Sequence, residues 1–197
     1  MKVAEEKSSN ESPVIIEDLL TINPFSRSGK FLDKIMALVI HNIGVGGQSA
    51  KEARNYWENL KTQEDRDAKP DISASAHFII DLDGKIIRTI PETEKAYHCG
   101  ATTYTLEAQD FFGNYCTDRT MSPNRVSIGI ELTHPDSSGK PTRETFESAL
   151  LLVRFLCEKY GLNPRKDVWR HWDITRKNCP RWFVSHESAW TLFLESI

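Results

Sequence analysis

The sequence predicts a single α/β domain in which α-helices flank a central mixed β-sheet. Three observations support this fold class: strand-like and helix-like stretches alternate along the chain, five Trp and nine Phe residues can build a core, and 197 residues suffice for one domain but barely for two. Residues 1–13 are mostly charged and polar, so we expect a flexible tail ahead of a domain that spans residues 14–197.

The first predicted elements are a buried strand and an amphipathic helix. The apolar run 35–40 is typical of a buried strand, and it delivers His41 to the end of that strand. Ser49 and Glu52 fit a capping box, in which each side chain binds the other residue's backbone N–H. Apolar residues follow at helical spacing, which predicts a helix with one buried face. They are Ala53, Tyr56, Trp57 and Leu60.

A hairpin and a long connection come next. Residues 77–82 and 85–90 read as strands on either side of Asp83-Gly84, a dipeptide that predicts a type I′ turn. Residues 91–124 are aromatic, polar and rich in turn formers without a clear period. We expect them to form a folded surface loop that can line a cleft.

Residues 126–132 predict a second buried strand that carries one acidic residue. Alternation places Val126, Ile128, Ile130 and Leu132 on one face and Glu131 on the other. Burying a carboxylate costs free energy unless something pairs with it. Two interpretations stay open at this point: Glu131 lies on a solvent-exposed face, or it serves a catalytic site as a general base.

The remaining elements are a long helix, a short strand and a last helix. Apolar spacing over residues 146–160 predicts a core helix, which Gly161 ends. Residues 167–170 resemble a short strand that leads into His171. Ser185 is placed to cap a final amphipathic helix.

Charge and cysteine content exclude several classes of protein. The net charge of −3 offers no basic surface for nucleic acid, and no apolar run reaches the roughly 18 residues of a transmembrane helix. We expect neither a nucleic-acid partner nor a membrane span, and we expect a monomer. The four cysteines have no C-x-x-C spacing, which argues against a disulfide scaffold, although a bridge between Cys99 and Cys116 stays open.

Three residues have side chains suited to zinc. His41 and His171 each follow a predicted strand, and Cys179 lies in a loop eight residues after His171. Two imidazoles and one thiolate would leave a fourth tetrahedral position for water, as catalytic zinc sites do. Lys177, two residues before Cys179, would lie on the same side of an extended loop. Spacing alone leaves open that these are separate polar residues, each satisfied by its own neighbours.

Several local strings together resemble a known family. The strings are VIHNI (39–43), SAHFII (75–80) with Asp83-Gly84 behind it, YHCG (97–100), NRVSIGIEL (124–132), HWD (171–173) and KNCP (177–180). In this order they resemble the zinc-dependent N-acetylmuramoyl-L-alanine amidases, a family that includes phage lysins, bacterial muropeptide amidases and animal peptidoglycan recognition proteins. The resemblance covers residues 14–197 and implies the amidase/peptidoglycan-recognition fold.

The resemblance implies roles for five residues. His41, His171 and Cys179 would bind Zn²⁺, with Cys179 where other members have Asp. Glu131 matches the acidic catalytic residue and would act as general base toward a zinc-bound water. Lys177 matches a lysine that would stabilise the developing oxyanion.

The resemblance also implies two residues of the substrate cleft, and it shows one departure. Asn42 and His98 match positions that line the cleft in relatives. Some phage members place a catalytic tyrosine directly before the histidine of the His-Phe-Ile-Ile strand, whereas Ala76 stands here. The proton transfers would therefore depend on Glu131.

The implied reaction is hydrolysis of the amide bond between N-acetylmuramic acid and L-alanine in peptidoglycan or in released muropeptides. The substrate class implies the cell envelope, periplasmic or extracellular. This expectation rests on the substrate alone, since the N-terminal residues lack the apolar stretch of a secretory signal. Two alternatives remain. One is a peptidoglycan-binding module without catalysis, and the other is a closed structural zinc site with His77 or His98 as a fourth ligand.

Overall fold

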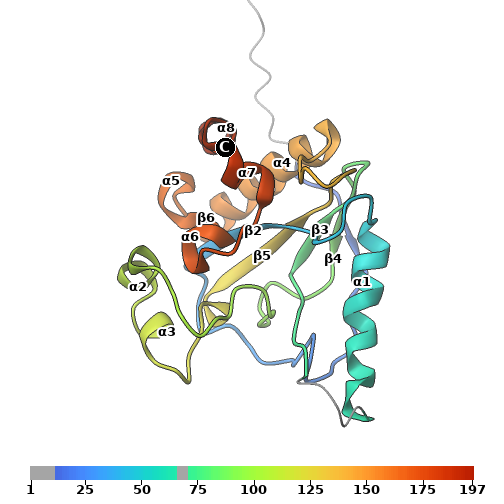
Figure 1. Cartoon of the computed structure of the whole chain (residues 1–197), viewed down its shortest axis with the longest axis vertical. Coiled ribbons are helices and arrows are strands. Elements are labelled where there is room, and N and C mark those ends of the chain that lie inside the picture. Colours follow the sequence, from blue (N-terminus) through green and yellow to red (C-terminus); the bar gives the residue numbers. More distant parts are fainter. Residues whose placement is uncertain (1–11, 66–70) are drawn as a thin grey trace, which may run out of the picture.

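A mixed six-stranded sheet runs through the computed structural model, which describes residues 12–65 and 71–197 (Figure 1). The strand order is β1-β4-β3-β5-β2-β6, and the β3–β4 pair is antiparallel while the other neighbours are parallel. The strands are β1 (Ile15–Glu17), β2 (Ala37–Asn42), β3 (Phe78–Ile80), β4 (Ile86–Arg88), β5 (Ser127–Leu132) and β6 (Val168–Arg170). The predicted mixed sheet is confirmed. The tail expected at residues 1–13 falls almost wholly outside the described residues.

Helices cover both faces of the sheet (Figure 1). They are α1 (Ala50–Asn59), α2 (Leu106–Phe112), α3 (Asn114–Thr117), α4 (Arg143–Tyr160), α5 (Pro164–Asp167), α6 (His171–Thr175), α7 (Arg181–Ser185) and α8 (Glu187–Glu195), with 3-10 turns at Leu60–Asp65 and Pro123–Arg125. The first face packs against α4, α7 and α8, and the second packs against α1 at one end and α2 and α6 at the other. The second face is therefore open between α1 and α6.

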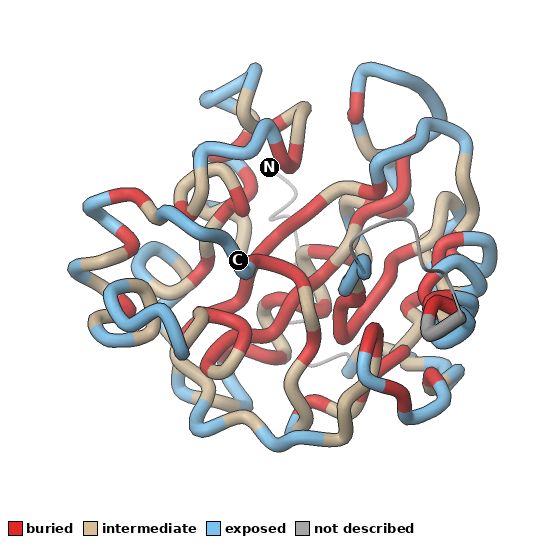
Figure 2. Tube along the Cα trace, turned by 60° about the horizontal axis from the view of Figure 1, so that its bottom comes forward, coloured by how far each residue is buried: buried red, intermediate tan, exposed pale blue. Residues whose placement is uncertain are grey.

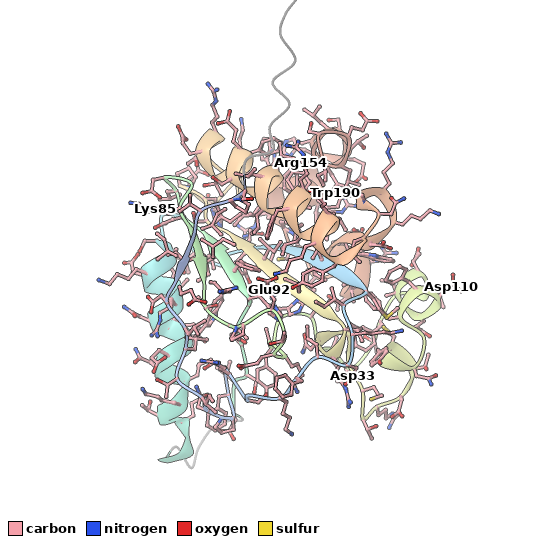
Figure 3. All side chains as sticks on the ribbon, turned by 180° about the vertical axis from the view of Figure 1, so that it is seen from behind. Asp33, Lys85, Glu92, Asp110, Arg154 and Trp190 are labelled. Atoms are coloured by element: carbon pink, nitrogen blue, oxygen red, sulfur yellow. The ribbon has the colours of Figure 1, made fainter. Side chains whose placement is uncertain are left out.

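The largest core cluster lies between the sheet and α4. Alternate residues of the central strands, such as Ile40 of β2 and Ile130 of β5, pack against Leu152 and Leu156 of α4 and are fully buried. Trp190 of α8 joins the same cluster (Figure 3). The central strands β2, β3 and β5 are buried along almost their whole length (Figure 2), which makes them a rigid platform for groups at their ends.

Glu92 shows how this fold satisfies a buried acid. It lies on the α4 side of the sheet (Figure 3), is 5% exposed, and forms ion pairs of 3.0 Å with Arg88 and 2.8 Å with Lys159. The Tyr160 hydroxyl donates a further hydrogen bond to it. Burial alone would raise the pKa of Glu92, but these partners together lower it. A buried carboxylate in this protein can thus be fully paired.

Several predicted elements are confirmed with their end signals. Ser49 and Glu52 form the predicted capping box at the start of α1. Gly161 ends α4 in the left-handed conformation, with φ of 65°. The strand over residues 126–132 and the short strand before His171 are present as β5 and β6. The two helix ends could be predicted from the sequence because each capping signal involves residues within about one helical turn.

Three local predictions are wrong. A type I′ turn requires positive φ at both central residues, but within 81–85 only Gly84 has a positive φ. The backbone N–H of Asp81 instead binds the Lys85 carbonyl, so the turn has three residues, 82–84, and Gly84 forms a bulge at its end. The connection 91–124 is not a plain loop, because it contains α2, α3 and part of a 3-10 turn. Its expected place along a cleft is confirmed, since Tyr97, His98 and Asn124 line a pocket. Ser185 does not cap the last helix: it is the last residue of α7, and His186 is the residue before α8.

An acidic side chain of α1, Glu58, helps to hold the segment that follows β1. Glu58 accepts hydrogen bonds from the Thr21 N–H (3.0 Å) and from Lys61 (2.6 Å), and it pairs with Arg54 at 3.2 Å. Burial alone would raise the pKa of Glu58, but these partners lower it from 4.5 to about 2. The carboxylate therefore stabilises the fold above pH 4.5, and this contribution disappears as the pH falls toward 2.

We expect Glu58→Gln to lower the free energy of unfolding by about 1 kcal/mol at pH 7, since water screens part of the interaction. Urea unfolding measured from pH 7 to pH 3 should show this difference shrinking as the pH falls. Glu147→Gln, which removes an exposed carboxylate paired only along α4 with Arg143, is the matched control and should change little. An equal loss at pH 7 and pH 3 would contradict the assignment.

Candidate active site and metal centre

The sheet brings the three predicted zinc ligands together. His41 lies near the end of β2, and His171 begins α6 directly after β6, the strand paired with β2. Cys179 lies in the loop between α6 and α7. Nδ1 of His41 is 3.0 Å from Nδ1 of His171 and 3.8 Å from Sγ of Cys179, and the three donor atoms lie within 4.8 Å of one another.

This donor set fits a zinc ion. Nitrogens bound to one tetrahedral Zn²⁺ lie about 3.3 Å apart, and a nitrogen and a thiolate sulfur about 3.6 Å apart. The observed separations of 3.0 and 3.8 Å are close to these values. Imidazole nitrogen and thiolate sulfur are also the donor types that zinc favours. His41, His171 and Cys179 are therefore the residues that would hold the ion.

Burial tunes the protonation of the ligands. It lowers the pKa of His41 well below the usual value and that of His171 to about 4, with the nearby Lys177 charge lowering both further. Both imidazoles are therefore neutral at pH 7, as metal binding requires. Burial, reinforced by the Glu131 charge, raises the pKa of Cys179 to about 12. The thiol must consequently lose a proton when it binds a metal.

Glu131 is an unpaired acid beside the ligands. Its neighbour across the β2–β5 ladder is His41, so the register of two parallel strands sets the carboxylate next to the donor atoms. Among the described residues, Oε2 of Glu131 is buried and has no hydrogen-bond partner. Burial raises its pKa to about 7, although the Lys177 charge acts in the opposite direction. Glu131 thus differs from Glu92, whose carboxylate is fully paired.

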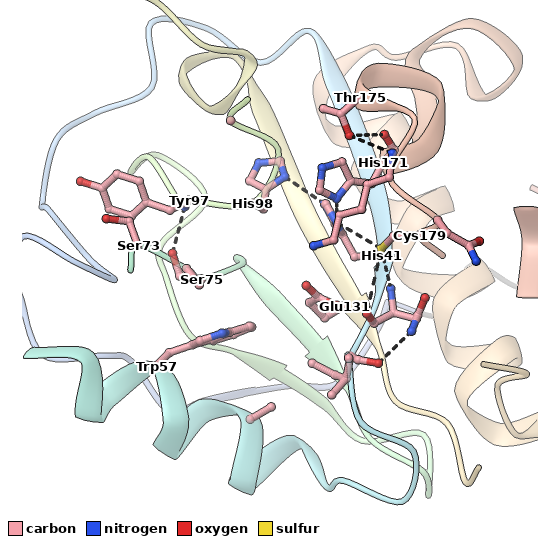
Figure 4. A pocket seen from close by; sticks show the side chains of 18 of the residues that line it. His41, Trp57, Ser73, Ser75, Tyr97, His98, Glu131, His171, Thr175 and Cys179 are labelled. Atoms are coloured by element: carbon pink, nitrogen blue, oxygen red, sulfur yellow. Dashed lines mark hydrogen bonds between the residues drawn. The ribbon is translucent and has the colours of Figure 1, made fainter. Parts of the chain in front are cut away.

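A pocket of about 990 Å³ opens onto these residues. In Figure 4, the imidazoles of His41 and His171 and the thiol of Cys179 gather at one side, Glu131 lies beside them, and Trp57 of α1 forms the opposite wall. Exposed Lys177 lines the same pocket, as the spacing from Cys179 predicted. The gap between α1 and α6 is thus a cleft with the donor set at its edge.

Asn42 also lines the pocket, but its amide is bound within the protein. Nδ2 donates to the Ile43 carbonyl (2.8 Å) and lies 3.1 Å from Nε2 of His134, and Oδ1 accepts from the Arg181 N–H at 2.6 Å. The backbone N–H of Asn42 donates to Sγ of Cys179 at 3.4 Å. These contacts fasten the Cys179 loop to the end of β2. Contact with substrate stays a prediction for this residue.

His98 lines the pocket next to His41. Its Nδ1 lies 3.1 Å from Nε2 of His41, and its Nε2 lies 3.3 Å from the Ser127 carbonyl oxygen. It is 9% exposed. Both ring nitrogens face groups of the protein, and contact with substrate stays a prediction for His98 as well.

Comparison with known protein families shows which family has this domain. Residues 32–182 match the family described as N-acetylmuramoyl-L-alanine amidase. The chain is a member of that amidase family. This confirms the resemblance inferred from the sequence strings.

Curated relatives of this amidase domain come from Bacillus. It is 31% identical over 183 residues to the N-acetylmuramoyl-L-alanine amidase BlyA of Bacillus subtilis (strain 168), an alignment that covers 91% of this chain and 46% of BlyA. It is also 31% identical to the N-acetylmuramoyl-L-alanine amidase CwlL of Bacillus licheniformis, over 93% of this chain and 46% of CwlL. The chain spans about half the length of these relatives.

Solved structures confirm the fold of the amidase domain. The catalytic domain of XlyA superposes with a TM-score of 0.65 at 24% identity, covering 93% of this chain and 99% of that one. PlyL gives a TM-score of 0.66 at 22% identity, covering 92% and 95%. Both likenesses support the single α/β domain predicted from the sequence.

The sequence did not indicate two residues that support the site. His134 follows β5 and was assigned to a loop, but it is 1% exposed and binds the Ile43 carbonyl at 2.6 Å. Asn124 accepts hydrogen bonds through Oδ1 from the backbone N–H groups of His98 (3.1 Å) and Cys99 (2.8 Å). Cys99 and Cys116 are free thiols, so the bridge left open is absent from this structure.

Proposed function

We propose that this chain hydrolyses the amide bond between N-acetylmuramic acid and L-alanine of peptidoglycan or muropeptides in a zinc-dependent reaction. One observation carries the proposal: Glu131, whose Oε2 is buried and has no hydrogen-bond partner among the described residues, lies beside a His-His-Cys donor set at the edge of an open pocket. The names of the Bacillus relatives support the same substrate. On this proposal the chain acts at the cell envelope. Within residues 12–65 and 71–197, no helix has the length and apolar character needed to cross a membrane.

Each residue contributes a distinct step to the proposed reaction. When bound, Zn²⁺ lowers the pKa of a water ligand toward about 7 and polarises a carbonyl. Glu131 takes the proton of the attacking water and returns it to the leaving amine, a role suited to a pKa near 7. Lys177 stabilises the negative charge that develops on the carbonyl oxygen.

The contacts of the other two histidines argue against a closed structural zinc site. His98 faces His41 and Ser127 through its two ring nitrogens. Nδ1 of His77 accepts from the Gly129 N–H at 3.0 Å, and Nε2 lies 2.8 Å from the Glu94 carbonyl. Neither side chain has a free nitrogen to complete the coordination, which supports a fourth position open to the pocket.

A binding module without catalysis is the second candidate, and digestion of purified peptidoglycan separates the two. We expect mass spectrometry to show new L-alanine amino termini, with sugar chains intact, only when the protein retains its metal. Dialysis against a chelator should reduce cleavage by more than about 100-fold, and added Zn²⁺ should restore it. Tight binding to peptidoglycan without any new amino termini, with zinc present, would favour the binding module.

A further inference from the structure

We propose that His98 is a positioning residue that orients His41 for zinc by accepting a hydrogen bond from its second ring nitrogen. This inference rests on the proposed zinc role of His41. It assigns His98 a function toward the metal centre in place of the substrate contact that its position in the cleft suggested.

The direction of the hydrogen bond follows from the chemistry of His41. Nδ1 of His41 faces the other donor atoms, at 3.0 Å from His171 and 3.8 Å from Cys179. A nitrogen that binds a metal carries no proton, so the proton of a neutral His41 must lie on Nε2. Nε2 lies 3.1 Å from Nδ1 of His98, and this N–H therefore donates to His98.

The same argument determines which ring nitrogen of His98 carries the proton. Its Nδ1 is the acceptor, so its own proton lies on Nε2. That nitrogen lies 3.3 Å from the Ser127 carbonyl oxygen, which can only accept. Every donor in the series from His41 through His98 to Ser127 therefore has an acceptor, and one tautomer of each imidazole is selected.

His98 is itself held in place from two directions. Oδ1 of Asn124 accepts from the backbone N–H groups of His98 and Cys99 and holds the turn that carries the imidazole. Beneath the ring lies Gly129 of β5, where an added Cβ would be 2.6 Å from Cγ of His98. Only glycine leaves room for the imidazole at this position. A side chain that served only as part of the cleft wall would not need this support.

His77 provides a matched comparison. It is also a buried histidine, and its ring centroid lies 5.9 Å from that of His98. Its nitrogens bind the backbone of Gly129 and Glu94 and not a ligand residue. Changes at His77 and His98 should therefore affect the stability of the fold in similar ways, whereas only changes at His98 should affect the metal.

The test measures zinc affinity by competition with a chromophoric chelator, alongside the thermal midpoint of the metal-free protein. We expect His98→Leu to weaken zinc binding by about 10- to 100-fold, the usual effect of losing a hydrogen-bond partner of a metal-bound histidine. His98→Asn should restore most of the affinity, since Oδ1 of asparagine can accept near the position of Nδ1. His77→Asn should leave zinc affinity within about twofold of the unchanged protein. In the zinc-saturated enzyme, we expect His98→Leu to lower kcat with little change in KM.

The outcomes separate this inference from the proposed function. If the unchanged protein binds zinc and cleaves peptidoglycan while His98→Leu binds zinc equally well, the positioning role is wrong and the proposed function stands. If the unchanged protein binds no zinc, both fail. Should His98→Leu not fold, His98→Gln replaces it, because its longer side chain moves the acceptor away from the position of Nδ1. Equal zinc affinities of His98→Gln and His98→Asn would then overturn the inference.

Discussion

Replacing Cys179 by serine is expected to remove zinc and activity together. The Cys179 thiol is 5% exposed and is one of three donor atoms within 4.8 Å of one another. A serine hydroxyl is a poorer zinc ligand and does not ionise near neutral pH, so the site would keep two ligands. We expect zinc affinity to fall by more than about 100-fold, beyond the usual effect of losing only a hydrogen-bond partner of a ligand. Metal content after dialysis at a fixed free zinc concentration measures this loss.

The chain offers both a matched control and a rescue for this experiment. Cys157 of α4 is also a free thiol with 5% exposure, but it belongs to the core cluster on the opposite face of the sheet. Cys157→Ser should lower stability and leave zinc content unchanged. Cys179→Asp should keep part of the zinc, because carboxylate oxygen is a zinc ligand in its own right. A Cys179→Ser variant that binds zinc stoichiometrically and cleaves peptidoglycan would disprove the ligand assignment.

The sequence predicted those parts of the site that depend on strand ends. His41 follows an apolar run and His171 follows a predicted short strand, and parallel strands bring equivalent ends to the same edge of a sheet. Glu131 was identified because it interrupts an apolar strand. Which strands are neighbours is not visible in any local pattern, however, and the pairing of His41 with Glu131 depends on the β2–β5 register. The resemblance to a family supplied that missing long-range information.

Other features had no local signal. Strand β1 has three residues, and its side chains are exposed or half-buried at the sheet edge, so it shows no alternation. Helix α2 is short, and its pattern is obscured by the aromatic and polar residues around it. The contacts of Asn42 with His134 and Arg181 join segments about 90 and 140 residues apart. Hydrogen bonds of this kind are set by tertiary packing, which periodicity cannot reveal.

Replacing Glu131 by glutamine is expected to abolish most activity while the zinc site survives. Glutamine has nearly the same shape but cannot accept and return a proton, and loss of a general base typically lowers kcat by about 10²- to 10⁴-fold. Glu131 is not among the three grouped donor atoms, so zinc content should not change. Steady-state hydrolysis of a defined muropeptide, combined with metal analysis of the same sample, measures both quantities. Full activity in this variant, or loss of its zinc, would contradict the assigned role.

The same substitution should also stabilise the metal-free protein at high pH. The pKa of Glu131 is raised by burial from 4.5 to about 7, so the folded state holds a proton that the unfolded state has released between these values. The stability of the metal-free protein therefore falls as the pH rises from 4.5 through 7, because folding must take up a proton that the unfolded state has released. Above pH 7 the folded state instead holds a buried carboxylate that is charged and whose Oε2 has no partner among the described residues. Glutamine stays neutral throughout.

We therefore expect Glu131→Gln to raise the free energy of unfolding of the metal-free protein by about 2 kcal/mol at pH 8 and by almost nothing near pH 4.5. Urea unfolding of chelator-treated protein at the two pH values measures this difference, with the exposed Glu158→Gln as the control for removing one negative charge. A gain in stability together with a loss of activity would show that the fold tolerates an unfavourable buried charge because the reaction needs it. Equal stability of the two proteins at pH 8 would instead mean that the pocket solvates the Glu131 carboxylate and that burial does not raise its pKa.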